Sequence, residues 1–120
     1  GRWIAFNGND MDMTIDLQQP TEISSVAISV NIAKGDWVFD ARNLSVEVSD
    51  DGKTFKKIAS EEYPAMKEMD KDGVVDHQLT FAPVTTQYVR VIASPEKTLP
   101  EWHGGKGKNA FLFVDEIKID

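Results

Sequence analysis

The chain has 120 residues, which is enough for one domain with a single buried core. Its formal charge of −7 at pH 7 argues against duplex nucleic acid and anionic lipid as partners, because both require a net basic face. The chain has no cysteine, which excludes disulfide frameworks, zinc ribbons and cysteine nucleophiles. It begins at Gly1 without a methionine, and we interpret it as a fragment of a longer protein.

Alternation of apolar and polar residues with a period of two predicts β-strands along most of the chain. In chain order, the expected strands are 11–17, 26–32, 44–48, 54–60, 74–82, 87–94 and 110–119. No segment keeps a helical period for three turns. The pattern is therefore typical of an all-β protein, built as an antiparallel β-sandwich or jelly roll.

The lengths of the connections predict where a binding surface lies. Three connections are short: the Asp51-Gly52 hairpin turn and the segments 17–22 and 82–86. If neighbouring strands run in opposite directions, these turns share one end of the sandwich. The opposite end then collects the loops 7–10, 33–42, 61–73 and 95–109. Loops gathered at one end of a rigid β scaffold commonly form binding surfaces.

These loops carry side chains suited to binding a sugar. The apolar face of a pyranose stacks on an aromatic ring, and its hydroxyls require directional donors and acceptors. The candidate carbohydrate-binding residues are Trp102, His103, Lys106, Trp37, Arg42 and Tyr63. A structural alternative stays open for each: a loop tryptophan can close the end of the sandwich, His103 can be a hydrogen-bonded loop residue, and Arg42 can pair with Asp40 or Asp36.

No constellation of residues indicates catalysis. A glycosidase needs two carboxylates about 5–10 Å apart in a cleft, and none of the 20 acidic residues stands out as such a pair. The two histidines, His77 and His103, form no zinc-type pair, and no nucleophile elbow or phosphate loop occurs. Trp3 and Phe6 are expected in the core, and Arg90 is expected to pair with a carboxylate on the sheet.

Six stretches in order resemble the coagulation factor 5/8 type C, or discoidin-like, domain. They are "WIAFNGND" at 3–10, "TIDL" at 14–17, "ISSVAISV" at 23–30, "LSVEVSDDGKTF" at 44–55, "QYVRVIAS" at 87–94 and "FVDEIKI" at 113–119. The spacing of the last part, "PEWHGGKGKNAFLFVDEI", most resembles the version attached to bacterial family 20 glycoside hydrolases. Those enzymes are the chitobiases or β-N-acetylhexosaminidases.

The resemblance implies a galactose-binding-like jelly roll of the kind found in family 32 carbohydrate-binding modules, with 1–120 as a single domain. Such a module is non-catalytic and targets an attached chitobiase or β-hexosaminidase to glycans that contain galactose or N-acetylhexosamine. The domain would be a monomeric C-terminal part of an exported bacterial enzyme, either periplasmic, associated with the outer membrane or extracellular. It would lack its first strand and have no nucleic-acid or membrane partner.

The resemblance also bears on calcium. In relatives an acidic residue near the end of the domain can face a calcium ion, which points to Glu116 here. Calcium needs six to eight oxygen ligands, and the opening loop that supplies much of the site in relatives is missing before Gly1. A calcium site is therefore expected, if anywhere, in the complete domain, and no other cofactor is expected.

A second interpretation of the whole chain stays open. The domain could be a structural or protein-interaction unit that packs against a neighbouring catalytic domain. Trp102 and Trp37 would then be buried between domains, and the chain would have no sugar site.

Overall fold

The computed structural model describes residues 4–120, and these residues form the expected all-β fold. Within them the helical structure is limited to the short 3-10 helix η1 (Lys34–Asp36), and no helix is long and apolar enough to cross a membrane. The strands are β1 (Ile4–Asn7), β2 (Met11–Ile32), β3 (Asn43–Ser49), β4 (Lys56–Glu62), β5 (Gly73–Ser94) and β6 (Phe111–Ile119).

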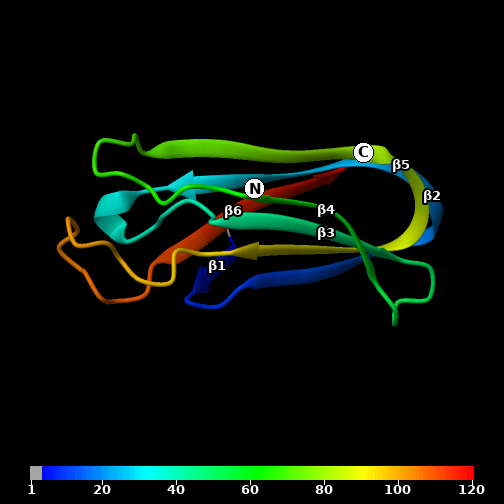
Figure 1. Cartoon of the computed structure of the whole chain (residues 1–120), viewed down its shortest axis with the longest axis horizontal. Helices are drawn as coiled ribbons and strands as arrows, with labels where there is room; N and C mark the ends of the chain where they lie inside the picture. The colour runs from blue at the N-terminus through cyan, green and yellow to red at the C-terminus, as the bar shows by residue number, and fades with distance from the viewer. Residues whose placement is uncertain (1–3) are drawn as a thin grey trace.

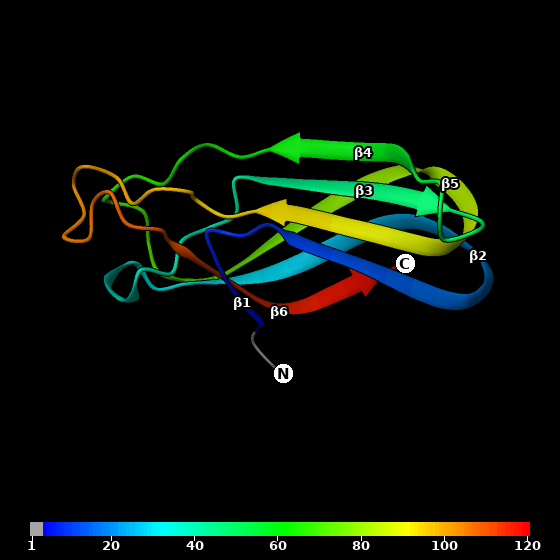
Figure 2. The ribbon, with the colours of Figure 1, turned by 90° about the horizontal axis from the view of Figure 1, so that it is seen from below.

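The six strands form one antiparallel sheet that folds over on itself. Their order is β1-β6-β2-β5-β3-β4. The central strands β2 and β5 each have 22 residues and are paired from Met11↔Ala93 to Ile32↔Gly73. Both strands curve over together at one end, so that each contributes one half to each of two facing layers (Figures 1 and 2). One layer contains β1 and β6, and the other contains β3 and β4.

The segments 17–22 and 82–86 are bends within long strands, so the expectation that they connect separate strands is wrong. The ladder between β2 and β5 is interrupted between Asp16 and Thr21, shifts register again between Ile23 and Ser25, and then continues to Ile32. Pro20 and Pro83 lie outside the paired positions, where their missing amide donors cost no ladder hydrogen bond.

The core lies between the two layers and follows the predicted alternation. Val26, Ile28, Val30 and Ile32 are buried along β2, and every second residue of β3 from Leu44 to Val48 is buried as well. Phe6 is partly buried and packs against this core, as expected. The same expectation for Trp3 concerns a position outside the described residues.

The Asp51-Gly52 turn forms the predicted hairpin between β3 and β4. Gly52 has a φ of 74°, the left-handed conformation that glycine adopts without steric cost. The Asp51 carboxylate accepts hydrogen bonds from the Lys53 and Thr54 amides at 2.8 and 2.9 Å. This hairpin lies at the same end as the bend of β2 and β5 (Figure 1).

The long connections gather at the opposite end, as the lengths of the segments predict. We call this the loop end and define it by the segments 33–42, 63–72 and 95–110, which lie together at the left of Figures 1 and 2. The β1–β2 turn is tied to it, because the Lys97 ammonium donates to the Gly8 carbonyl at 3.2 Å and to Asp10 at 2.7 Å. A small second core of Phe39, Leu99 and Ala110 closes this end.

Candidate functional site

Four rings from two loops meet at the loop end, and we call them the aromatic cap: Trp37, Phe39, Trp102 and His103. Trp102 stacks on the buried Phe39 with ring centroids 5.7 Å apart and planes at 19°. His103 lies edge-on to the other three rings, with centroid distances of 5.5 to 6.4 Å. The two tryptophans therefore belong to one surface, with the imidazole between them.

The glycine-rich segment that carries Trp102 is held in place by its own backbone. Leu99 N–H donates to the Lys108 carbonyl at 2.8 Å, and the Gly107 N–H donates to the Leu99 carbonyl at 3.2 Å. Leu99 is buried beside Phe39 and anchors the segment to the small core. The conformational entropy of this run is thus offset by a closed set of local hydrogen bonds and one apolar anchor.

Trp102 has a mixed environment that matches neither sequence interpretation alone. It is partly buried and packs on the small core through the Phe39 stack, as a residue that closes the sandwich would. The indole is nevertheless not enclosed, because its exposure is intermediate. Trp102 therefore supports the aromatic cap and leaves part of its surface open to solvent.

Trp37 is the more available ring, with 36% of its surface exposed. It has a left-handed backbone conformation (φ 68°, ψ 18°), which is costly for a bulky side chain and persists only where neighbours impose it. Here the Trp37 N–H donates to the Lys34 carbonyl at 3.1 Å, and its carbonyl accepts from Phe111 N–H at 2.7 Å. The backbone of Trp37 is consequently held in place at the point from which the indole extends.

A second group at the loop end is polar and centres on Arg42. Its Nη1 lies 3.2 Å from both carboxylate oxygens of Glu96, and its Nε donates to the Tyr63 carbonyl at 3.1 Å. The Arg42 side chain is 40% exposed and that of Glu96 is 16% exposed. The alternative that Arg42 pairs with Asp40 or Asp36 is wrong, because the chain brings Glu96 beside it from 54 positions away.

Tyr63 forms part of the wall behind this pair. Its ring stacks on His77 at 4.0 Å, and His77 Nε2 lies 2.6 Å from Asp40 Oδ1. The Tyr63 hydroxyl is buried and has no hydrogen-bond partner among the described residues. Burial, helped by the nearby Glu61 and Asp40 charges, raises the pKa of Tyr63 to about 12. The hydroxyl is therefore directed away from the surface.

The F5/8 type C domain profile matches residues 1–112 of the chain. The chain belongs to the F5/8 type C domain family. This confirms the resemblance at the level of the family. No curated protein matches this F5/8 type C domain.

Several solved structures share the fold of this F5/8 type C domain. CpGH89CBM32-5 from Clostridium perfringens, in complex with GalNAc-β-1,3-galactose, has a TM-score of 0.57 and 19% identity over 90% of this chain and 63% of that chain. The CBM32 of AlyQ, in complex with 4,5-unsaturated mannuronic acid, has a TM-score of 0.60 and 15% identity over 98% of this chain and 76% of that chain.

A third similar structure is much larger. The rhamnosidase from Novosphingobium sp. PP1Y has a TM-score of 0.56 and 21% identity over 91% of this chain but only 8% of that chain. This F5/8 type C domain thus spans less than two thirds of CpGH89CBM32-5 and a small part of the rhamnosidase. At these identities the comparisons establish the fold.

Lys106 borders the aromatic cap through its backbone, because its N–H donates to the His103 carbonyl at 3.1 Å, whereas Glu116 lies on β6. Lys106 is exposed in the F5/8 type C domain, with its ammonium 3.8 Å from the Glu101 carboxylate. Glu116 is exposed on β6 beside Ser29 of β2. No group of three or more His, Cys, Asp or Glu residues that could hold a metal ion occurs within residues 4–120, so Glu116 has no companion ligands there.

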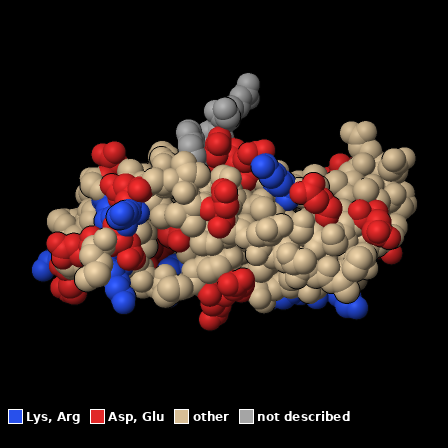
Figure 3. Space-filling view, turned by 90° about the horizontal axis from the view of Figure 1, so that it is seen from above, with Lys and Arg blue, Asp and Glu red and all other residues tan. Residues whose placement is uncertain are grey.

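Charges at the loop end are mixed. On the face shown in Figure 3, Lys and Arg side chains at this end of the F5/8 type C domain lie among Asp and Glu side chains. Ion pairs such as Arg42–Glu96 and Lys97–Asp10 account for part of this mixture. The loop end therefore offers alternating donors and acceptors rather than an extended basic field.

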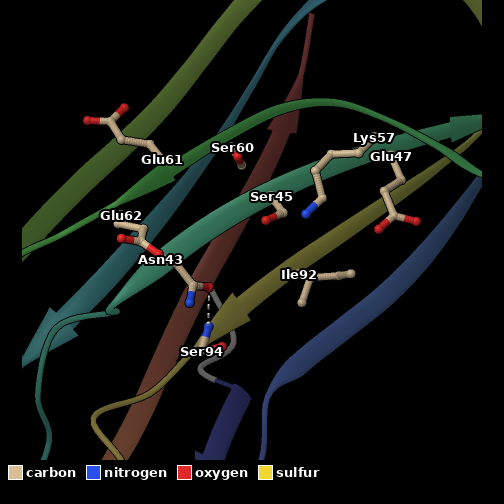
Figure 4. A pocket seen from close by; sticks show the side chains of 9 residues that line it. All are labelled: Asn43, Ser45, Glu47, Lys57, Ser60, Glu61, Glu62, Ile92 and Ser94. Atoms are coloured by element: carbon tan, nitrogen blue, oxygen red, sulfur yellow. Dashed lines mark hydrogen bonds between the residues drawn. The ribbon is translucent and has the colours of Figure 1, made fainter.

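A polar groove of about 300 Å³ lies elsewhere, on the outer face of β3, β4 and β5 (Figure 4). Its lining is Asn43, Ser45, Glu47, Lys57, Ser60, Glu61, Glu62, Ile92 and Ser94. None of these side chains is aromatic, so the groove has no ring on which a pyranose can stack. The exposed ring of Trp37 makes the loop end the better candidate for binding a sugar.

Sequence reasoning missed two residues that shape the candidate site. They are Glu96 and Phe39, and each acts through a contact with a residue distant in sequence. The glycine-rich run itself predicts a close approach of its backbone, which Gly105 makes against Trp37. Nothing in the neighbouring sequence distinguishes Glu96 from the other acidic residues.

Proposed function

We propose that this F5/8 type C domain is a non-catalytic carbohydrate-binding module that holds a glycan at the loop end. The observation that carries the proposal is the exposed indole of Trp37. The backbone of this residue has a left-handed conformation, and hydrogen bonds hold it there. A preorganised aromatic platform lowers the entropic cost of binding a flexible ligand. Modules of the same fold are known in complex with GalNAc-β-1,3-galactose and with an unsaturated mannuronic acid.

In this proposal, Trp37 stacks on the apolar face of one sugar ring. Arg42 supplies directional donors through its Nη2. Glu96 binds Nη1 and the Tyr63 carbonyl binds Nε, whereas Nη2 has no partner among the described residues. Glu96 supplies acceptor oxygens from the same ion pair. Trp102 borders the site with its open surface, and Lys106 reaches hydroxyl or acetamido groups of a longer glycan.

We further propose that the module serves an exported bacterial β-N-acetylhexosaminidase of the chitobiase type and targets that enzyme to glycans as a monomer. Support comes from the sequence resemblance to modules attached to family 20 glycoside hydrolases. The occurrence of the same fold within the large rhamnosidase chain is consistent with an accessory role. Mass spectrometry of the native protein from its source would identify the attached domains directly.

Binding is tested by titrating the 15N-labelled domain with galactose, N-acetylglucosamine, N-acetylgalactosamine and GalNAc-β-1,3-galactose, followed by NMR. We expect Trp37→Ala to weaken the best of these interactions about thirtyfold, since a central aromatic contact contributes about 2 kcal/mol. Phe55→Ala removes an aromatic ring beside the hairpin at the opposite end and is the matched control. Circular dichroism verifies the fold of both variants.

The titration also separates the proposal from the packing alternative. If none of the four sugars shifts any resonance of the loop end, the proposed function is wrong for these glycans. If sugars bind but Trp37→Ala has no more effect than Phe55→Ala, the glycan site lies elsewhere. A domain that binds no sugar yet stabilises its catalytic neighbour would favour the structural role.

A further inference from the structure

The imidazole of His103 links the two loops of the aromatic cap through both of its nitrogens. Nε2 lies 2.6 Å from the Lys34 carbonyl oxygen, and Nδ1 lies 2.9 Å from the Gly105 nitrogen. A carbonyl only accepts and a backbone N–H only donates, so the pattern requires a proton on Nε2 and a lone pair on Nδ1. The geometry therefore corresponds to one neutral tautomer of His103.

Both hydrogen-bond partners of the imidazole, the Lys34 carbonyl and the Gly105 amide, belong to residues that contact Trp37. The Lys34 carbonyl that accepts from His103 also accepts the Trp37 N–H, which is the bond that closes the 3-10 turn before the left-handed residue. Gly105 lies against the indole itself, where a Cβ would be 2.9 Å from two ring atoms. His103 thus fixes the backbone behind Trp37 and the surface on which its ring rests.

Protonation of His103 is incompatible with this arrangement. A proton on Nδ1 would face the Gly105 N–H, so that two donors oppose each other and the Gly105 amide loses its acceptor. Histidine is the side chain that ordinarily changes charge between pH 5 and 8. Protonation of His103 would therefore release Gly105 and loosen the support beneath the indole.

No charged side chain makes a hydrogen bond to the His103 ring within residues 4–120. The charged groups nearest to it along the two loops are Lys34, Asp36, Glu101 and Lys106, and Lys34 also binds Asp72 and the Asp70 carbonyl. The Lys34 ammonium pairs with Asp72 at 3.1 Å, and Lys106 faces Glu101. Within residues 4–120, no carboxylate accepts a hydrogen bond from the His103 ring.

We infer that neutral His103 is a positioning residue, which holds Trp37 as a sugar platform and makes glycan binding decrease with acidification. This inference rests on the proposed function and names a regulation of that same site. It also assigns His103 a role different from direct sugar contact, because a hydroxyl could engage the ring only by displacing a backbone partner. Trp37 touches the glycan, and His103 acts through Trp37.

The structural part of the inference is tested without any sugar. In the 15N-labelled wild-type domain, long-range proton–nitrogen spectra report the tautomer of His103 directly. We expect Nε2–H at pH 7.5. Between pH 7.5 and 5.0, the Trp37 indole N–H and the Gly105 amide should shift with the same midpoint as the His103 ring. If the Trp37 and Gly105 resonances do not shift together with the His103 ring, the positioning role is wrong.

The functional part compares affinity for GalNAc-β-1,3-galactose at pH 7.5 and 5.0. The wild-type domain should bind up to about tenfold more weakly at pH 5.0, as expected when one ordered side chain at an interface becomes mobile. His103→Gln keeps an N–H donor for the Lys34 carbonyl but does not titrate. The ratio of its affinity at pH 7.5 to its affinity at pH 5.0 should be close to one. His77→Gln alters the other histidine and should keep the wild-type ratio.

These outcomes separate the two proposals. If the wild-type domain binds the disaccharide equally at both pH values, or if His103→Gln keeps the wild-type ratio, the positioning role fails and the module remains a glycan binder. If neither the disaccharide nor its component sugars bind at either pH, the proposed function fails. The wild-type spectra still decide whether His103 positions Trp37.

Discussion

The indole of Trp37 rests directly on the backbone of Gly105. A methyl group built on the Gly105 Cα would lie 2.9 Å from Cε2 and Cζ2 of the indole, closer than side-chain carbon atoms approach in folded proteins. The contact joins the segment 33–42 to the segment 95–110. The exposed ring can occupy this position only because Gly105 has no side chain.

Gly105→Ala is therefore expected to displace the Trp37 ring and weaken glycan binding by up to about tenfold, by loss of a preorganised platform. The backbone of Gly105 does not have a positive φ, so the effect is steric: the added Cβ would lie 2.9 Å from the Trp37 ring and also 2.9 Å from Cδ1 of Leu99. Isothermal titration with the best-binding sugar measures the change.

Gly104→Ala is the control for this prediction, because a Cβ at Gly104 meets nothing within 4 Å. It should bind sugar as the wild-type domain does. Equal affinities of Gly105→Ala and the wild-type domain would show that the ring position is irrelevant to binding.

Arg42→Gln should weaken glycan binding about tenfold and lower the free energy of unfolding by about 1 kcal/mol. The affinity falls because the charged donors are lost, and the stability falls because Glu96 loses its ionic partner while only 16% of its side chain is exposed. Urea unfolding and sugar titration of the same preparation measure the two effects separately.

Arg90→Gln provides the comparison for Arg42. As expected from the sequence, Arg90 pairs with sheet carboxylates, with Nη2 2.6 Å from Asp12 and Nη1 3.4 Å from Glu47. Its hydrogen bonds with Asp12 raise the pKa of Arg90. This variant should lose stability without losing affinity, and a similar loss of affinity in both variants would indicate a general loss of structure.

Tyr63→Phe is expected to leave sugar affinity unchanged and to raise the free energy of unfolding by up to about 1 kcal/mol. The hydroxyl is buried without a partner among the described residues, and removing such a group relieves a desolvation penalty. Denaturant unfolding and sugar titration test both statements. A fall in affinity would instead place the Tyr63 hydroxyl in contact with the glycan.

Acid should destabilise the hairpin end through Asp51. The backbone amides of Thr54 and Lys53 and the Ser49 hydroxyl lower the pKa of Asp51 to about 2. Because the folded-state pKa is below the ordinary value of about 3.9, this stabilisation is present above about pH 4 and is lost as the pH falls towards 2. Asp51→Asn should therefore flatten the dependence of unfolding free energy on pH in this range.

The neighbouring Asp50 gives the matched variant for this measurement. Its side chain makes no hydrogen bond within the described residues, so Asp50→Asn should keep the wild-type slope between pH 4 and 2. Urea unfolding at several pH values provides the data. Parallel slopes for the two variants would contradict the role assigned to the Asp51 carboxylate.

Much of the fold follows from short stretches of sequence. Alternation predicts the buried faces of 26–32 and 44–48, and Asp51-Gly52 predicts the hairpin. The continuity of β2 and β5 through their bends could not be predicted in this way. A turn-rich segment such as 17–22 stays within a strand only because its partner strand bends with it, and the partner lies about 70 residues away.

The sequence by itself determined the all-β class, the gathering of long loops at one end and membership of the F5/8 type C family, because these depend on periodicities and short motifs. Tertiary structure alone decided which aromatic ring is available: Trp102 stacks on Phe39, while Trp37 is held out over Gly105. It also decided that Arg42 pairs with Glu96 and that both nitrogens of His103 are occupied. Each of these depends on contacts between loops far apart in the chain, and no local propensity encodes such distances.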